Sequence, residues 1–197
     1  MLNFTDLTGL GGVAVAISAA CRLLPGIAKL TRTQLTILLV TVFVVSLIPF
    51  GGMPLAAYVR GVSGDLSIIT LALLYYALTR SVLGGSAEGI KSRYALLTLI
   101  TLFALLLYPL ALGFSLFDSY RLGYGESWFV VALLLIAFLA WDQKSYLITT
   151  CIAMATLAWA VGWYESDNLW DYLLDPWLAI YALFSIGLAV ARIFISK

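Results

Sequence analysis

The chain has 197 residues, of which 63% are hydrophobic and 11% are charged, and its mean hydropathy is +1.04. Soluble domains carry about 25% charged residues, and a small domain leaves much of its area in contact with solvent. The composition therefore excludes a purely water-soluble fold, and we expect a single transmembrane domain over residues 1–197. The formal net charge of +1 conceals a strong asymmetry along the chain.

Seven apolar segments approach the roughly 20 residues that a helix needs to cross a bilayer core of about 30 Å. They predict an all-α, polytopic integral membrane helical bundle with seven transmembrane segments. The first segment is rich in glycine and alanine and contains Arg22 and Pro25. The prediction falls to six spans if this segment is interfacial or re-entrant. The segments are 9–27, 35–59, 66–83, 94–113, 128–141, 145–163 and 177–195.

The basic residues predict the orientation of these spans, because Lys and Arg accumulate in short cytoplasmic loops. With the N-terminus outside, two basic residues, Arg60 and Arg121, lie on the outer side, and two acids, Glu88 and Asp142, lie on the inner side. We therefore expect a bacterial-type inner (plasma) membrane protein with a cytoplasmic C-terminus and an extracytoplasmic N-terminus. If the first segment does not cross the membrane, the other six spans keep the same orientation and only the N-terminus moves to the inner side. The inner basic residues are Arg22, Lys29, Arg32, Arg80, Lys91, Arg93, Lys144, Arg192 and Lys197.

Several kinds of chemistry are made unfavourable by the residues that the chain lacks. It contains no histidine, which removes histidine-ligated haem and zinc and every Ser-His or Cys-His nucleophile. Cys21 and Cys151 each lie within an apolar segment, and we interpret them as small packing residues. No Asp, Glu or Lys lies in the middle of an apolar segment, which argues against ion-coupled transport. We expect no catalytic residue, no metal and no cofactor, and the pattern leans away from an enzyme.

The second segment is interrupted where Pro49, Gly51, Gly52 and Pro54 follow one another. Proline removes a backbone donor and glycine permits unwinding. A broken helix exposes backbone groups that can bind a ligand when protein or a water cavity surrounds them. The alternative is a kink near the outer surface followed by an interfacial turn.

The loop 114–127 carries Arg121 between two tyrosines. A guanidinium matches a phosphate or carboxylate group bidentately, and Arg60 is the other basic residue that can converge on this side. The alternative is that Arg121 pairs with Asp118, three residues away. Asp65 and Asp118 are the one pair of outer carboxylates that could share a catalytic water. The predicted ligand-binding residues are Arg60, Asp65, Asp118, Arg121 and Tyr124.

The loop 163–177 interleaves acidic residues with tryptophan and tyrosine. Such aromatic rings favour membrane interfaces, and residues 168–174 can form a short amphipathic helix lying on the membrane, with Asn168 or Asp167 as cap and Pro176 at its end. An aromatic belt is one interpretation, and a docking surface for a periplasmic partner is the other. The predicted partner-binding residues are Trp163, Trp170, Asp171, Tyr172 and Trp177.

Two functions fit these patterns. The first is a non-catalytic integral membrane subunit or scaffold of an inner-membrane complex that acts at the cell envelope. The alternative is a small transporter or lipid- or substrate-binding membrane protein that uses the broken second segment and the outer arginines. The expected partners are the lipid bilayer and another membrane or periplasmic protein, and no nucleic acid.

Overall fold

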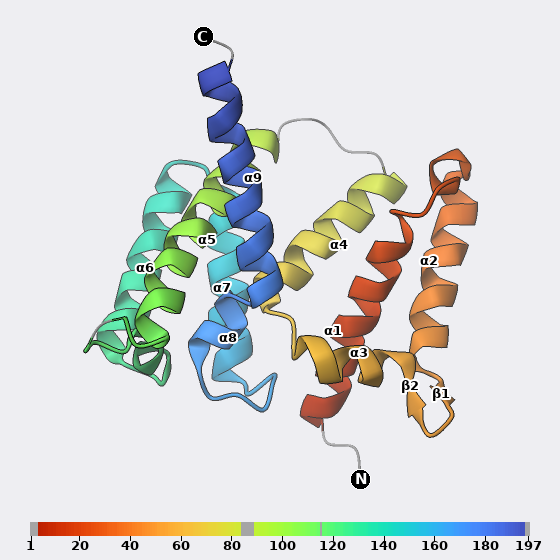
Figure 1. Cartoon of the computed structure of the whole chain (residues 1–197), viewed down its shortest axis with the longest axis horizontal. Coiled ribbons are helices and arrows are strands. Elements are labelled where there is room, and N and C mark those ends of the chain that lie inside the picture. The colour runs from red at the N-terminus through yellow and green to blue at the C-terminus, as the bar shows by residue number, and fades with distance from the viewer. Residues whose placement is uncertain (1–3, 84–88, 115, 196–197) are drawn as a thin grey trace. The chain divides into compact units, whose positions relative to one another are not determined.

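A computed structural model describes residues 4–83, 89–114 and 116–195, and Figure 1 shows its arrangement of helices. The chain is all-helical, as predicted: 78% of it is helix, in nine α-helices over the described part. Glu88 and Lys197, both predicted to lie on the inner side, fall outside the described residues. The chain forms two compact units. Unit 1 comprises the described residues of Met1–Leu66, Thr70–Ser86 and Gly162–Glu165, and unit 2 those of Ser67–Ile69, Ala87–Val161 and Ser166–Lys197.

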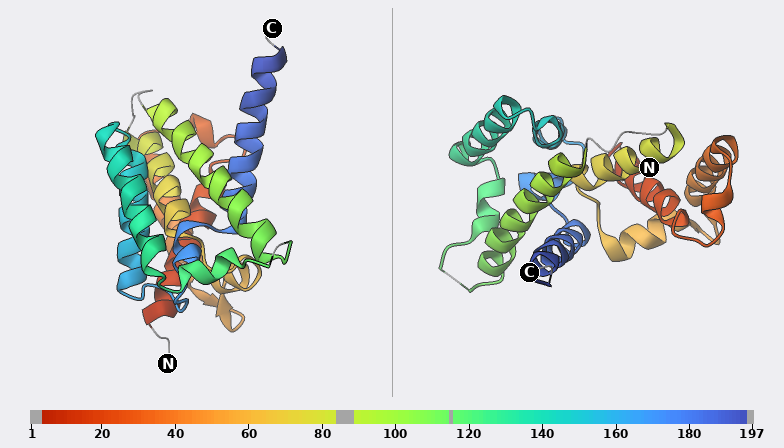
Figure 2. Two further views of the ribbon diagram at one scale, coloured as in Figure 1. Left: turned by 90° about the vertical axis from the view of Figure 1, so that its left-hand side faces the viewer. Right: turned by 90° about the horizontal axis from the view of Figure 1, so that it is seen from above.

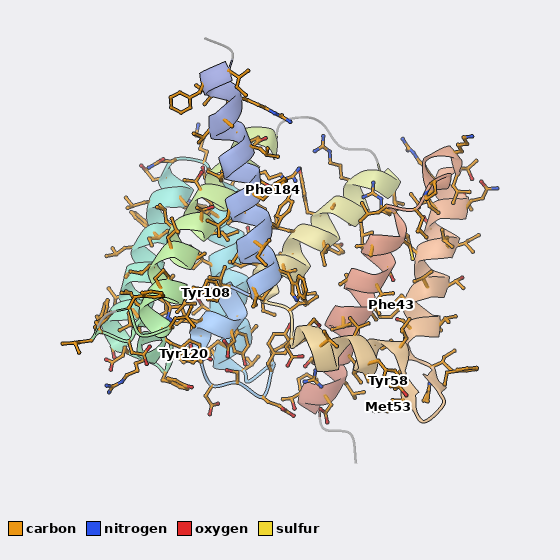
Figure 3. The ribbon with its side chains drawn as sticks, viewed as in Figure 1. Phe43, Met53, Tyr58, Tyr108, Tyr120 and Phe184 are labelled. Atoms are coloured by element: carbon orange, nitrogen blue, oxygen red, sulfur yellow. The ribbon has the colours of Figure 1, made fainter. Side chains whose placement is uncertain are left out.

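Unit 1 is built around α1. A small cluster of buried side chains, Leu10, Val13 and Ala14 of α1 with Ala56 of α3, forms its core, and Phe43 of α2 packs against this cluster (Figure 3). Small residues allow helix backbones to approach closely, which is the usual basis of helix packing in lipid. The elements are α1 (Phe4–Cys21), the short 3-10 helix η1 (Ile27–Lys29), α2 (Arg32–Leu47), β1 (Pro49–Phe50), β2 (Met53–Pro54), α3 (Leu55–Ser63) and α4 (Ile68–Leu83), of which Ile68 and Ile69 belong to unit 2.

The predicted break in the second segment is a tight β-hairpin between α2 and α3. Phe50 pairs with Met53 in antiparallel register, and the two residues between them, Gly51 and Gly52, have φ angles of 69° and 108°. Two-residue hairpin turns with positive φ at both positions favour glycine, which has no Cβ to clash. The hairpin ends α2 at Leu47. The helix is therefore shorter than the predicted second segment, which runs to residue 59.

A four-residue segment from late in the chain, Gly162–Glu165, completes unit 1. The Thr8 hydroxyl donates a hydrogen bond to the Trp163 carbonyl, and the rings of Phe4 and Trp163 meet edge to face with centroids 5.6 Å apart. The Tyr164 hydroxyl donates to the Leu66 carbonyl at 2.8 Å. The start of α1 and the connection into α4 are therefore held by residues that follow them by about a hundred positions or more.

Unit 2 contains the remaining helices, and α6 and α7 pack side by side in it (Figure 2). The buried residues of α5 include Leu96, Leu97 and Ile100, spaced so that they share one face of the helix, as an amphipathic pattern of period 3.6 requires. Leu133 of α6 and Ile152 of α7 are likewise 1% exposed. The elements are α5 (Gly89–Ala111), η2 (Ser119–Gly123), α6 (Ser127–Asp142), α7 (Tyr146–Ala160), α8 (Leu169–Leu173) and α9 (Pro176–Ile195).

Three helices of the described chain are long and apolar enough to cross a membrane: Phe4–Cys21, Lys91–Ala111 and Pro176–Ile195, with mean hydropathies of 1.5, 2.1 and 2.2. The other four predicted segments correspond to shorter apolar helices of 10–17 residues. Seven full-length spans are therefore not shown. Two of the short helices, α6 and α7, are separated by a tight turn in which Lys144 has a φ of 57°, and α2 is shortened by the hairpin.

The first segment, which the sequence made doubtful, is one of the three long helices. It begins at Phe4 rather than at residue 9, and it ends at Cys21. Pro25 consequently lies beyond the helix and does not break it. The doubt rested on the glycine and alanine content of the segment and on Arg22 and Pro25, and both of these residues follow the end of the helix at Cys21.

The two faces of α6 differ enough to be tested against each other. Leu133 is 1% exposed and the adjacent Leu134 is 57% exposed. We expect Leu133→Ala to destabilise the protein by about 2–5 kcal/mol, because the core is left with a cavity, and Leu134→Ala to have little effect. Thermal unfolding midpoints in a mild detergent measure both. Equal losses for the two variants would contradict this packing of α6.

Candidate functional site

Arg60 lies at the centre of an ionic cluster in unit 1. Its Nε and Nη2 atoms donate to the two carboxylate oxygens of Asp65 at 2.6 and 3.0 Å, and its Nη1 donates to Asp6 Oδ1 at 3.1 Å. Bidentate arginine–carboxylate pairs are among the strongest hydrogen-bonded contacts in proteins. We call Asp6, Arg60 and Asp65 the Arg60 cluster. It joins the first turn of α1 to α3 and to the residues that precede α4.

The electrostatics of the Arg60 cluster keep its guanidinium charged. The hydrogen bond to Asp65 raises the pKa of Arg60 above its ordinary value, although burial acts in the opposite direction, and the hydrogen bond to Asp6 raises it further. The side chains of Arg60, Asp65 and Asp6 are 19%, 25% and 29% exposed. The cluster is therefore largely shielded from water, and two carboxylates already engage the guanidinium.

Gly9 of α1 allows this cluster to lie directly on the helix backbone. A Cβ atom at position 9 would stand 2.7 Å from Arg60 Nε and closer still to Asp65 Oδ1. Real Cβ atoms do not approach other atoms so closely, so any larger residue displaces the ion pair. Gly11, two positions further along, has no atom within 4 Å of the equivalent point.

An open depression of about 410 Å³ adjoins the Arg60 cluster within unit 1. Glu165 contributes a third carboxylate to this region, so carboxylates outnumber the single guanidinium. A depression of this charge does not favour a phosphate or carboxylate ligand. The residues that line it are Asp6, Leu10, Ala57, Arg60, Gly61 and Glu165.

A second polar cluster, centred on Asp171, joins η2 to α8 in unit 2. The Tyr120 hydroxyl lies 3.0 and 3.1 Å from the two carboxylate oxygens of Asp171 and donates to this group, and the Ser166 hydroxyl donates to the same carboxylate. Burial, together with the negative charge of Asp171, raises the pKa of Tyr120 above its ordinary value. The phenol is thus held as a hydrogen-bond donor. We call Tyr120, Ser166 and Asp171 the Asp171 cluster.

Asn168 confirms the predicted start of the short helix α8. Its side-chain oxygen accepts from the Trp170 backbone N–H at 2.9 Å, and its amide nitrogen donates to the Tyr120 carbonyl at 3.0 Å. The helix does not lie on the surface as predicted. Leu169, Trp170, Tyr172 and Leu173 are all at most 1% exposed, because α8 is packed into unit 2.

The predicted ligand-binding residues fall into two groups. Arg60 and Asp65 meet in the Arg60 cluster of unit 1, whereas Asp118, Arg121 and Tyr124 lie at η2 of unit 2. Asp118 caps η2 by accepting from the Tyr120 backbone N–H at 2.9 Å. No ion pair between Arg121 and Asp118 is recorded in the part of the chain that the structure describes. Arg121 is exposed, beside the 61% exposed Tyr124.

The predicted partner-binding residues divide by exposure. Trp163 and Trp177 are 38% and 53% exposed, whereas Trp170 and Tyr172 are 1% and 0% exposed. The Trp170 ring packs against Phe129, with centroids 4.6 Å apart, and its Nε1 donates to the Ser119 carbonyl at 3.0 Å. The Asp171 carboxylate already accepts hydrogen bonds from Tyr120 and Ser166. Of the predicted docking residues, Trp163 of unit 1 and Trp177 of unit 2 are thus the exposed ones.

Sequence reasoning missed a buried carboxylate next to α9. Asp175 is 3% exposed; its Oδ1 accepts from the Leu178 backbone N–H at 2.9 Å. Its Oδ2 accepts from the backbone N–H and the hydroxyl of Ser67 at 2.9 and 2.8 Å. An acidic residue directly before a proline at the first helical position is a recognisable helix-start pattern. That pattern was the signal available for Asp175, but nothing in the sequence indicates Ser67 as its partner.

Comparisons of the chain with protein-family models, with curated proteins and with solved structures find no match. The described residues contain no group of three or more metal-ligating side chains.

Gly9 and Gly11 offer a matched test of the Arg60 cluster. Gly9→Ala should lower stability by about 1–3 kcal/mol, the usual cost of overpacking, because the new methyl group meets the Arg60–Asp65 pair. Gly11→Ala has free space and should be neutral or gain up to about 1 kcal/mol in helix propensity. Thermal unfolding in detergent measures both. A stable Gly9→Ala variant would show that the ion pair does not rest on α1.

Proposed function

We propose that the chain is a non-catalytic integral membrane subunit or scaffold of an inner-membrane complex acting at the cell envelope. The observation that carries this proposal is the uncovered apolar surface of the long helices. Only 33%, 28% and 17% of the spans Phe4–Cys21, Lys91–Ala111 and Pro176–Ile195 are buried within the chain. Helices that are apolar on most sides need lipid or other helices around them.

The distribution of charge supports insertion across the membrane. In unit 1, Asp6 lies in the first turn of α1 and bonds Arg60, and Asp65 lies just before α4. At the other end of the same two helices, Arg22 follows α1 and donates to the Ala77 carbonyl of α4 at 3.1 Å. We propose that the basic end is cytoplasmic, following the positive-inside rule, with the N-terminus outside and the C-terminus inside.

The four shorter helices complete the proposed seven-span topology. Helices α2, α4 and α6 have 16 residues and α7 has 15, which at 1.5 Å per residue gives about 22–24 Å. Local thinning of the bilayer or flanking interfacial residues accommodate such short spans at modest cost.

The polar clusters support a structural rather than a chemical role for the outer end. Asp65, Asp171 and Asp175 each accept hydrogen bonds that join separate segments of the chain. Their carboxylates hold loops and helix ends in place. The exposed rings of Trp163 in unit 1 and of Trp177 in unit 2 each suit contact with another membrane or periplasmic protein, since tryptophan is enriched at the centre of protein interfaces.

Photo-crosslinking tests the scaffold proposal. A benzophenone amino acid at Trp163 or Trp177, in the native membrane, should give a discrete adduct with a protein that also copurifies in mild detergent. The matched control is Phe138, which is 68% exposed on α6 and should give no such adduct. A chain that runs alone in detergent and forms no adduct at either tryptophan contradicts the proposal.

A second candidate function is a small transporter or a lipid- or substrate-binding protein. The observations that favour it are the hairpin that breaks the second segment and the exposed Arg121 next to Tyr124. Arg60, engaged by Asp6 and Asp65, is less suited to an anion than the sequence predicted. Arg121 is therefore the residue on which this candidate depends.

Substitution of Arg121 separates this candidate from the scaffold. Arg121→Ala should weaken binding of short-chain phosphatidylglycerol to the detergent-solubilised protein about tenfold, since hydrogen bonds to charged groups are worth about 1.5–3 kcal/mol, with expression unchanged. Arg121→Lys keeps the charge and should lose less. If Arg121→Ala and Arg60→Ala both leave binding and transport unaltered, this function is ruled out.

A further inference from the structure

Helix α3 has two faces of different character. Ala56 is fully buried against α1. Arg60, one turn later on the same face, donates hydrogen bonds to Asp6 and Asp65. The opposite face carries an apolar stripe with the spacing i, i+3, i+4 and i+7, which places its members on one side of a helix. The stripe consists of Leu55, Tyr58, Val59 and Val62, which are 52%, 49%, 36% and 86% exposed.

This stripe continues an apolar surface that begins on α2. No charged residue occurs from Thr33 to Val59. After the first turn of α2, the exposed residues of this helix are uncharged and mostly apolar, with Thr36 and Thr41 among them. The hairpin adds Phe50 and Met53, which are 90% and 51% exposed. The exposed residues of α2 and its end include Ile37, Val40, Val44, Val45 and Ile48.

The length of α2 indicates where this surface lies relative to a bilayer. Its 16 residues span about 24 Å, short of a hydrocarbon core of about 30 Å. The hairpin follows directly at the end of α2, and α3 lies crosswise to α1 and α2 (Figures 1 and 2). A crosswise helix at the end of a short span lies at the depth where acyl chains meet headgroups.

We propose that the hairpin Pro49–Pro54 and α3 form an interfacial lipid anchor. The side chains of Leu55, Val59 and Val62 insert at the boundary of acyl chains and headgroups, and Tyr58 directs its hydroxyl toward the wet side, as tyrosine does in membrane interfaces. The carboxylates of Asp6 and Asp65 neutralise Arg60 on the other face. The anchor compensates for the shortness of α2.

The stripe is assigned to lipid rather than to a protein partner because it continues into the uncharged exposed face of α2. Protein interfaces have a polar rim around their apolar centre. The stripe instead merges, through Met53 and Phe50, with the uncharged face of α2, and from Thr33 onward the first ionisable charge is Arg60. This inference rests on the membrane insertion of the proposed function and is independent of the scaffold role.

Site-directed spin labelling of the full chain tests the anchor. Single cysteines replace Tyr58 and Val62, with Val59→Cys as a second variant of the same stripe, in a chain with Cys21→Ala and Cys151→Ala. The labelled protein is placed in vesicles of phosphatidylethanolamine and phosphatidylglycerol. Collisions of each nitroxide with oxygen, which concentrates in the bilayer, and with a water-soluble nickel complex are then compared.

Two reference positions calibrate the measurement. Val40 on α2 reports bilayer contact, and Glu165, exposed in unit 1, reports water. Labels at the stripe should favour oxygen over nickel, as Val40 does, at a shallower depth. Stripe labels that behave like Glu165 overturn the anchor, and so do labels shielded from both reagents, which would show that protein covers the stripe. If Val40 itself behaves like Glu165, the proposed membrane insertion fails together with the anchor.

Discussion

Hydrogen bonds to carboxylates at the ends of apolar helices are the interaction on which this structure depends. The helices have little buried surface of their own to hold them together, and a polar group without a partner is costly next to lipid. Asp65 engages Arg60 through two hydrogen bonds, Asp171 accepts from Tyr120 and Ser166, and Asp175 accepts from Ser67 and the start of α9. Asp171 and Asp175 thereby join segments that are distant in sequence, and Asp6 does the same by accepting from Arg60.

These contacts separate the roles of two arginines that the sequence predicts to lie on the same side of the membrane, Arg60 and Arg121. Arg60 looked available for an anion because it is one of two basic residues on that side. In the structure it is enclosed by Asp6 and Asp65, on a backbone that Gly9 leaves bare. Arg121, in contrast, is exposed on η2. The two arginines therefore differ in their environment: Arg60 is engaged by Asp6 and Asp65, whereas Arg121 is exposed.

The helical class, the approximate places of the apolar helices and the break at Pro49 to Pro54 could be read from composition and hydropathy, because these signals are local. The bounds of the first two helices could not. The cap of α8 at Asn168 was also predictable, since a cap involves only neighbouring residues. The burial of Trp170 and Tyr172 was not. An aromatic ring next to acids resembles an interfacial residue in sequence, and only the packing of Phe129 on Trp170 shows that it belongs to the core.

The segment Gly162–Glu165 imposes an order on biosynthesis. Unit 1 contains α1, α2 and α3, yet Trp163 and Tyr164 supply its last contacts. A ribosome adds about 5–20 residues per second, so several seconds pass between the synthesis of the early helices and the emergence of the segment that completes unit 1. During that interval Asp6 and Arg60 can already pair, whereas Thr8 has no Trp163 carbonyl to bind. The N-terminal half is thus assembled in two stages, and a nascent chain stopped before Gly162 carries an open first unit.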